Sequence, residues 1–368
     1  MAPVAKAPAG QPRWLVSARY DVGFFILPGL ISLIILFSSP RDLMESEAIP
    51  LWIWVALVVM IDVSHVYASL YRTYLDPEEF QRRRSLYLLV PGTLFLAGVS
   101  LYSVEALYFW RVLAYVAVIH FVRQQYGFLA LYKYRRGERL QWEARFDKGL
   151  LYLTTAYPLI YWHTHLPRKF VWFVDGDFLS IPVRQVSLWS GYLYLVWAIA
   201  YLAKELWFGR RGRPLNPGKH LVLFTTAVNW YVGIVLFNSD FSFTVTNVVA
   251  HGVPYLALVW IYGRRKWRKW PGSWRVQTWF QPSRVGLFLG LLVGLAFLEE
   301  VLWDLIVWKE HLVLLGERLS FPSWGHEVLS LVVPLLALPQ ATHYVLDAFI
   351  WKLNGSNPDL KQLLFLDE

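Results

Sequence analysis

Apolar runs of roughly 20 residues recur along the whole of this 368-residue chain, and they constrain its fold more than any other feature. A helix needs about 20 such residues to cross about 30 Å of hydrocarbon. Charged residues make up only 17% of the chain, whereas ordinary soluble domains contain about 25%. The length alone would allow two soluble domains, but the repeated apolar runs indicate one polytopic membrane domain.

We predict an all-α membrane helix bundle of about ten transmembrane helices. An N-terminal segment at 1–21 precedes the transmembrane domain at 22–350, and a tail follows at 351–368. Residues 1–21 lack the apolar core and the cleavage site of a signal peptide, so the first span is expected to stay uncleaved. The predicted spans lie at 22–39, 49–70, 85–104, 107–132, 149–166, 186–208, 221–237, 241–262, 285–308 and 327–350.

The distribution of Lys and Arg over the loops predicts the orientation. One side of the membrane carries 27 of the 35 basic residues and the other side carries six, with two inside spans. Because basic residues collect in cytoplasmic loops, we expect both termini in the cytoplasm. The basic segment 264–270 also contains Trp, but between two spans it is expected to contact anionic lipids. The net charge of +9 therefore predicts orientation and membrane-lipid contact, and no nucleic-acid partner.

The chain contains no cysteine. This excludes disulfides, iron–sulfur clusters, thiolate-ligated haem and cysteine nucleophiles. Any metal must therefore be held by His, Asp or Glu.

Four histidines lie inside predicted spans, where ionisable groups are costly and point to function. They are His65, His120, His251 and His343. Their four spans run in the same direction, from the outside to the cytoplasm. At 1.5 Å per residue, the histidines lie roughly 7–18 Å from the cytoplasmic ends. A common depth on four helices is what one shared site requires.

Each of these histidines has a polar companion about one helical turn away. Asp62 precedes His65, Asn247 precedes His251, Gln124 follows His120 and Asp347 follows His343. Neutral imidazoles are common metal ligands, and a carboxylate or amide often fixes their second nitrogen. We predict a metal bound by the four histidines, with Asp62 and Asp347 as ligands, catalytic groups or orienting partners. The alternative is that the histidines only form hydrogen bonds between helices.

Other polar residues leave several interpretations open. Arg123, Gln124 and Gln125 lie just cytoplasmic of His120, and with Asn247 they are candidates for substrate binding. Arg123 is placed to hold an acidic head group or to pair with Asp62 or Asp347. Glu299, Glu300 and Asp304 are candidates for metal binding, for a proton path, or, preferably, for pairing with Arg111. His163 and His165 are expected at the outward interface, without a metal.

Several motifs of common enzymes are absent, among them the Walker loop, GxGxxG, GxSxG, HExxH and the histidine boxes of fatty-acid desaturases. The stretches His120-Phe-x-Arg-Gln-Gln-Tyr-Gly and His343-Tyr-Val-Leu-Asp-Ala-Phe-Ile-Trp-Lys resemble parts of uncharacterised multi-spanning bacterial membrane proteins. One histidine per span also resembles, in arrangement only, the bacterial β-carotene dioxygenases of the Brp/Blh type. That resemblance implies iron, and the first implies a bacterial inner membrane.

These observations favour a membrane-embedded non-haem iron oxidoreductase that acts on a lipid-soluble substrate and takes electrons from a donor. The six candidate ligands would serve one or two irons. The first rival is an intramembrane zinc hydrolase of a lipid amide or ester. The others are a bis-histidine haem protein and a proton-coupled transporter.

Overall fold

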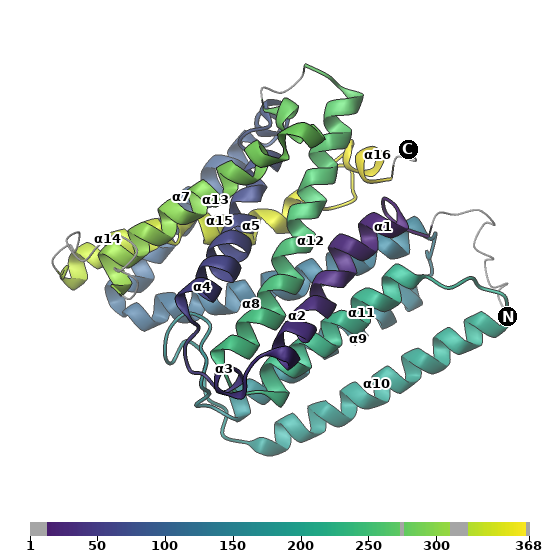
Figure 1. Cartoon of the computed structure of the whole chain (residues 1–368), viewed down its shortest axis with the longest axis horizontal. Coiled ribbons are helices and arrows are strands. Elements are labelled where there is room, and N and C mark those ends of the chain that lie inside the picture. Colours follow the sequence, from purple (N-terminus) through teal and green to yellow (C-terminus); the bar gives the residue numbers. More distant parts are fainter. Residues whose placement is uncertain (1–12, 273–275, 310–322, 366–368) are drawn as a thin grey trace.

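The computed structural model describes residues 13–272, 276–309 and 323–365. These residues form helices joined by loops and include no strand, which confirms the all-helical class (Figure 1). In chain order the helices are α1 (Ala18–Asp21), η1 (Val22–Ile26), α2 (Leu27–Ser38), α3 (Arg41–Met44), α4 (Leu51–Ile53), η2 (Trp54–Val63), α5 (Ser64–Ala68), η3 (Ser69–Arg72), α6 (Pro77–Arg82), α7 (Arg84–Val104), α8 (Ala106–Arg135), α9 (Gln141–Thr164), α10 (Arg184–Arg210), α11 (Pro217–Trp230), η4 (Tyr231–Leu236), α12 (Asp240–Lys269), η5 (Gln277–Phe280), η6 (Pro282–Arg284), α13 (Val285–Trp303), η7 (Asp304–Trp308), α14 (His326–Leu336), α15 (Leu338–Ile350) and α16 (Leu360–Leu364).

Several helices begin at residues that satisfy free backbone N–H groups. The side chain of Asp76 accepts from the backbone N–H of Glu79 at the start of α6. Asn216 does the same at the start of α11, and Ser239 at the start of α12. Such side-chain caps stabilise a helix start by about 1 kcal/mol.

The described residues include eight helices that are long and apolar enough to cross a membrane, or nine if the bent pair α14–α15 forms one span. The predicted spans at 22–39, 49–70, 85–104, 107–132, 186–208, 221–237, 241–262 and 285–308 coincide with the eight. The predicted span at 149–166 lies in α9, which is helical but is not among them. The total of ten spans and the cytoplasmic location of both termini therefore stay predictions.

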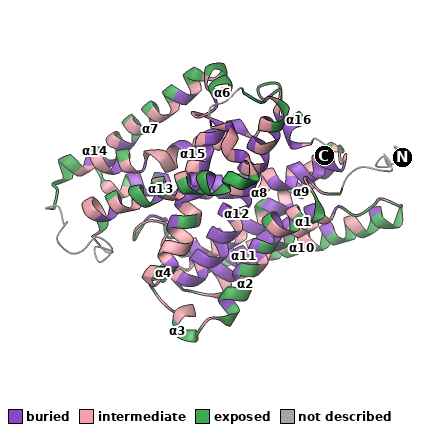
Figure 2. Cartoon of the chain, turned by 45° about the horizontal axis from the view of Figure 1, so that its top comes forward, coloured by how far each residue is buried: buried purple, intermediate pink, exposed green. Residues whose placement is uncertain are grey.

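The helix α12 runs through the middle of the molecule, and α10 lies along one edge (Figure 1). Most residues of α12 are buried, whereas α10 buries only three (Figure 2). Because α12 is surrounded by other helices, its polar side chains meet protein groups.

Two local departures from a regular helix lie close to the histidines. The π-helical segment η2 leads directly into α5, which carries His65. The helices α14 and α15 meet at an angle of 41°, with Pro334 and Pro339 on either side of the junction. Proline removes a backbone donor and commonly bends a helix, so α15 enters the bundle at its own angle.

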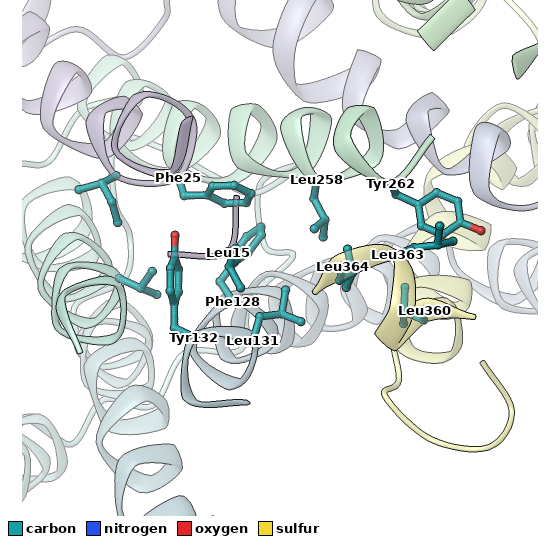
Figure 3. Packing of buried hydrophobic residues seen from close by; sticks show 12 residues of the cluster. Leu15, Phe25, Phe128, Leu131, Tyr132, Leu258, Tyr262, Leu360, Leu363 and Leu364 are labelled. Carbon is teal, nitrogen blue, oxygen red and sulfur yellow. The ribbon is translucent and has the colours of Figure 1, made fainter. Parts of the chain in front are cut away.

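A cluster of buried hydrophobic residues joins both ends of the chain to the bundle (Figure 3). Leu15 lies there beside Phe128 of α8, and Leu360, Leu363 and Leu364 of α16 pack against α12. The segment 351–368 was predicted as a tail. In the structure its described part folds back onto the bundle and buries the apolar face of α16.

Candidate metal centre

The structure brings the four intramembrane histidines together. His65 lies on α5, His120 on α8, His251 on α12 and His343 on α15. Each side chain is at most 4% exposed. The ring centroids of His65 and His251 are 4.7 Å apart, those of His120 and His343 4.6 Å, and those of His65 and His343 5.0 Å. Four helices that are distant in sequence therefore meet at one buried point.

The ring nitrogens of this group are placed as a metal site requires. His65, His120 and His343 each offer a nitrogen, the three nitrogens lie within 4.8 Å of one another, and the group can hold a metal ion. His251 adds a fourth ring, because its Nε2 is 3.1 Å from Nε2 of His65 and 3.3 Å from Nε2 of His120. Two nitrogens bound to one ion at about 2.0–2.1 Å are themselves about 2.8–3.4 Å apart.

Hydrogen bonds alone do not explain these contacts. An imidazole nitrogen carries either one hydrogen or one lone pair. Nε2 of His251 therefore forms a good hydrogen bond with His65 or with His120, but not with both. Neither ring nitrogen of His343 has a hydrogen-bond partner among the described residues. A bound cation removes both problems because it accepts a lone pair from each nitrogen separately.

Asp62 and Asp347 face the histidines from the outer side of the cluster. An Oδ1 atom of Asp62 lies 3.6 Å from Nδ1 of His65, and Oδ2 of Asp347 lies 3.8 Å from Nδ1 of His120. Neither carboxylate belongs to the group of converging nitrogens. Both carboxylates lie next to a ring nitrogen at distances longer than a hydrogen bond, and Nδ1 of His65 has no hydrogen-bond partner among the described residues.

Aromatic rings that sequence reasoning did not single out enclose the histidines. Phe121 stacks on His251 with ring centroids 3.6 Å apart, and Tyr344 lies 5.0 Å from the ring of His120. Tyr255 packs edge-on against His65 and His343. One available signal was spacing, because Tyr255 follows His251 by four residues and so shares its helix face.

A close approach of two backbones positions His251 next to His65. Gly252 of α12 faces Ile61 of η2, and a Cβ atom on Gly252 would lie 2.7 Å from Cγ2 and 3.1 Å from the carbonyl oxygen of Ile61. Only glycine fits at this contact without a shift of the neighbouring chain.

A cavity of about 580 Å³ reaches the cluster along α8 and α15. His120, Gln124 and Asp347 line it together with Arg123. Two of the predicted substrate-binding residues, Arg123 and Gln124, therefore lie in its wall.

The other two predicted substrate-binding residues lie elsewhere. Gln125 and Asn247 line a polar void of about 10 Å³ on another side of His251. Gln125 donates to the carbonyl of Ala250 and accepts from Thr226, so its amide links helices. The void has room for about one water molecule, and Asn247 Oδ1 and His251 Nδ1 beside it have no hydrogen-bond partner among the described residues.

The predicted pairing of Arg111 with the carboxylates of α13 and η7 is wrong. In the described part of the chain, Arg111 Nε donates to the carbonyl oxygen of Gly176 at 2.9 Å and forms no ion pair. Glu299 instead accepts hydrogen bonds from Tyr67 at 2.5 Å and Trp303 at 3.3 Å. Two neutral donors therefore contact Glu299, while Arg111 is bound to the loop after α9.

The remaining candidates take no part in the cluster. His163 contacts the hydroxyl of Tyr115 and the carbonyl of Leu159, and His165 stacks on Tyr161. Neither belongs to a metal-binding group among the described residues.

A second group of acids, Glu138, Glu143 and Asp147, also has ligand-like spacing. Lysine and arginine side chains already surround it: Lys133, Lys204, Arg213 and Lys219. This group is an ion-pair network between α8, α9, α10 and α11. The negative charges that a cation would need are compensated there.

Comparison with protein-family models, with curated proteins and with solved structures found no match for this chain. The site is therefore interpreted from its own geometry.

Proposed function

We propose that this protein is a membrane-embedded non-haem iron oxidoreductase that acts on a lipid-soluble substrate. The observation that carries the proposal is the meeting of His65, His120, His251 and His343 with nitrogen separations suited to a metal. Iron held by histidines with an open position supplies O2 activation when it is bound. In this proposal Asp62 and Asp347 hold two of the rings in place, and an electron donor reaches the site from outside the chain.

The cavity supports a lipid-soluble substrate. It touches His120 and continues between apolar side chains such as Ile119 and Phe349, both of which are exposed on the outside of the bundle. An opening of this kind in a membrane span faces hydrocarbon, so a substrate enters from the bilayer. Its volume lies within the range of about 300–1,000 Å³ that is usual for small-molecule sites.

Ten spans with both termini in the cytoplasm remain the proposed topology, in the inner membrane of a bacterium. Contacts at both ends of α9 support a crossing by this helix. Lys133, near the end of α8, contacts Asp147 near the start of α9. At the other end, Tyr115 of α8 contacts His163 of α9. The 24 residues of α9 extend about 36 Å, enough to cross the hydrocarbon core.

An intramembrane zinc hydrolase is the second candidate, and one observation favours it. Asp347 lines the cavity beside His120, and its Oδ1 has no hydrogen-bond partner among the described residues. A carboxylate oxygen without a partner, beside His120, suits a zinc hydrolase, which needs a group that accepts a proton from water.

Elemental analysis of the purified protein tests both candidates. Wild type is compared with His251→Ala and His343→Ala, and His326→Ala serves as a control because His326 is exposed at the start of α14. We expect iron in wild type and in the control, and its loss in both site variants. Zinc in place of iron, lost in the same variants, selects the hydrolase. No bound metal, or metal unaffected by both variants, overturns both and returns the protein to the transporter class.

A further inference from the structure

The cavity beside the candidate metal centre has a lining that is part polar and part apolar. His120, Gln124 and Asp347 form its inner wall, and the cations Arg123 and Lys352 also belong to its lining. Most of the remaining wall is apolar, with Val116, Ile119, Leu258 and Val345 among its residues. A ligand that matches this lining is an amphiphile with a charged head and a hydrocarbon chain.

The two cations of the cavity are exposed side chains. Neither Arg123 nor Lys352 forms an ion pair with another described residue, and Lys352 only lies over the ring of Phe349 at 4.8 Å. Some buried cations of this chain do have a counter-charge, for example Arg72 with Glu79 and Lys266 with Asp76. The sequence left open whether Arg123 pairs with Asp62 or Asp347. In the structure, the guanidinium of Arg123 lies more than 4 Å from both carboxylates. Its charge is available to an anion from outside the chain.

The buried amide of Gln124 gives the head a further contact. Its Nε2 donates to the carbonyl oxygen of His251 at 2.8 Å, which fixes the amide. Its Oε1 is buried, lies in a residue that lines the cavity, and has no partner among the described residues. A hydroxyl on the ligand or a bridging water satisfies this acceptor.

The size of the cavity limits the ligand. About 580 Å³ holds one drug-sized molecule, which suits a lipid with a single chain better than a two-chain phospholipid. Arg123 follows His120 by three residues, so the head lies about 5 Å along the helix from the metal ligand.

We propose that the cavity binds a single-chain lipid with an anionic head, a carboxylate or a phosphate. Arg123 and Lys352 hold the head, and the carbons nearest the head lie beside His120. The chemistry at those carbons rests on the proposed function, but the binding does not.

Binding of lipid probes to the full chain in phosphatidylcholine nanodiscs tests the proposal. The probes are hexadecanoate, hexadecyl phosphate and hexadecanol, which share one chain and differ in the head. We expect wild type to bind at least one anionic probe about tenfold more tightly than the alcohol, since only the anions form ion pairs with the two cations. The stronger anion identifies the head as carboxylate or phosphate.

Variants then locate the anion. Arg123→Gln and Lys352→Gln together should reduce anion binding to the level of the alcohol and leave alcohol binding unchanged. Arg184→Gln is the matched control because Arg184 is exposed at the start of α10, away from the cavity. Equal binding of all three probes by wild type, or full anion binding by the double variant, overturns the proposal.

A further variant tests the cavity by changing its volume and not its charge. Gly127 lines the cavity, and an added Cβ there meets no atom within 4 Å. Gly127→Leu should therefore fill part of the cavity and weaken binding of all three probes severalfold without misfolding. Unchanged binding by this variant places the lipids elsewhere.

Metal content measured on the same samples separates the two proposals. If metal is bound but anions are not preferred, the inference about the ligand fails and the proposed function stands. If anions are preferred in a protein without metal, the binding site stands and the proposed function fails.

Discussion

The rings of His65 and His120 each have two different sides. On one side, Nε2 of each ring points toward His251. On the other side, Nδ1 of each ring lies within 4 Å of a carboxylate. A carboxylate at Nδ1 favours the tautomer that carries hydrogen there, which leaves the lone pair of Nε2 free to bind a metal. The two aspartates are thus expected to strengthen metal binding by the histidines without occupying a coordination position on the metal.

Asp62→Asn and Asp347→Asn should each weaken metal binding by about 10–100-fold, the usual effect of losing such a partner. His120→Ala should abolish binding at the same site. Metal affinity is measured by competition with chelators of graded strength.

Asp175→Asn is the control, since Asp175 is exposed in the loop after α9, and it should leave affinity unchanged. If Asp347→Asn removed the metal as completely as His120→Ala does, Asp347 would be a direct ligand.

The sequence predicted that the four histidines lie together because histidine is rare in hydrocarbon, and equal depth on four parallel spans relates residues that are far apart. It did not predict Phe121 or Tyr255. Aromatic residues make up 17% of the chain, so their presence in a span carries little information. It also grouped Gln125 with Arg123, although neighbouring residues on a helix point in different directions.

The contact between α12 and η2 holds two of the clustered histidines, His65 and His251, close together. Gly252 follows His251 directly, and Ile61 lies four residues before His65. Any side chain on Gly252 has to push η2 away, so it also separates His251 from His65.

Gly252→Ala should lower the free energy of unfolding by about 1–3 kcal/mol through overpacking, and it should reduce the metal bound per chain. Thermal unfolding in detergent and elemental analysis measure the two effects. Gly290→Ala on α13 is the control because its added Cβ meets nothing within 4 Å, and alanine is the better helix former. Equal behaviour of the two variants would show that the backbone contact does not position His251.

A buried ion pair anchors the end of α15, which carries His343. Arg72 pairs with Glu79 at 3.1 Å and donates to the carbonyl oxygen of Ile350, the last residue of α15. Glu79 lies on α6, outside the predicted spans. Burial alone would raise the pKa of its carboxyl group, but the nearby Arg72 charge and the Tyr87 hydroxyl lower it by more, so that pKa lies below its ordinary value.

Glu79→Gln should destabilise the protein by about 3–5 kcal/mol because it leaves Arg72 buried without its counter-charge. Since the pKa of Glu79 is lower in the folded state, its contribution is complete at neutral pH and is lost as the pH falls below about 4 through the folded pKa. Thermal unfolding from pH 7 to pH 3 measures this loss, and the variant should lack that part of the pH dependence.

Glu78→Gln is the neighbouring control, because Glu78 is half exposed and its partner Lys266 keeps a second counter-charge, Asp76. Loss of a half-exposed carboxylate whose partner stays paired should cost about 0–1 kcal/mol. A similar loss in both variants would mean that burial of the Glu79 pair is not what stabilises this end of α15.

Hydropathy predicted most of the spans but neither the π-helical segment η2 nor the bend before α15. A window of about 20 residues reports how much apolar surface a segment carries. It does not report the hydrogen-bond register or the axis of the helix, which depend on neighbouring helices. Those two features aim His65 and His343, so the location of the site followed from the sequence whereas its geometry did not.

In the molecule as a whole, α9 decides the topology. It is a helix of 24 residues that carries Glu143, Asp147 and Lys148 near its start, and these charges lower its hydropathy. The charged end lies in the ion-pair network with Lys133, Lys204 and Lys219. If α9 crosses the membrane, the loops before and after it lie on opposite sides. If it does not, all later spans reverse direction, the two termini lie on opposite sides, and the strong bias of basic residues toward one side is lost.

The absence of cysteine makes this test direct, because a single introduced cysteine is the only thiol in the chain. Arg139→Cys and Asp175→Cys place it before and after α9, and a membrane-impermeant maleimide reports which side it faces. We expect Cys at 139 to react in inside-out vesicles and Cys at 175 to react in intact cells, since α9 then brings its start to the cytoplasmic side. Reaction of both from the same side would remove α9 from the spans. The four histidine-bearing helices would then no longer run in one direction, and their common depth would need another explanation.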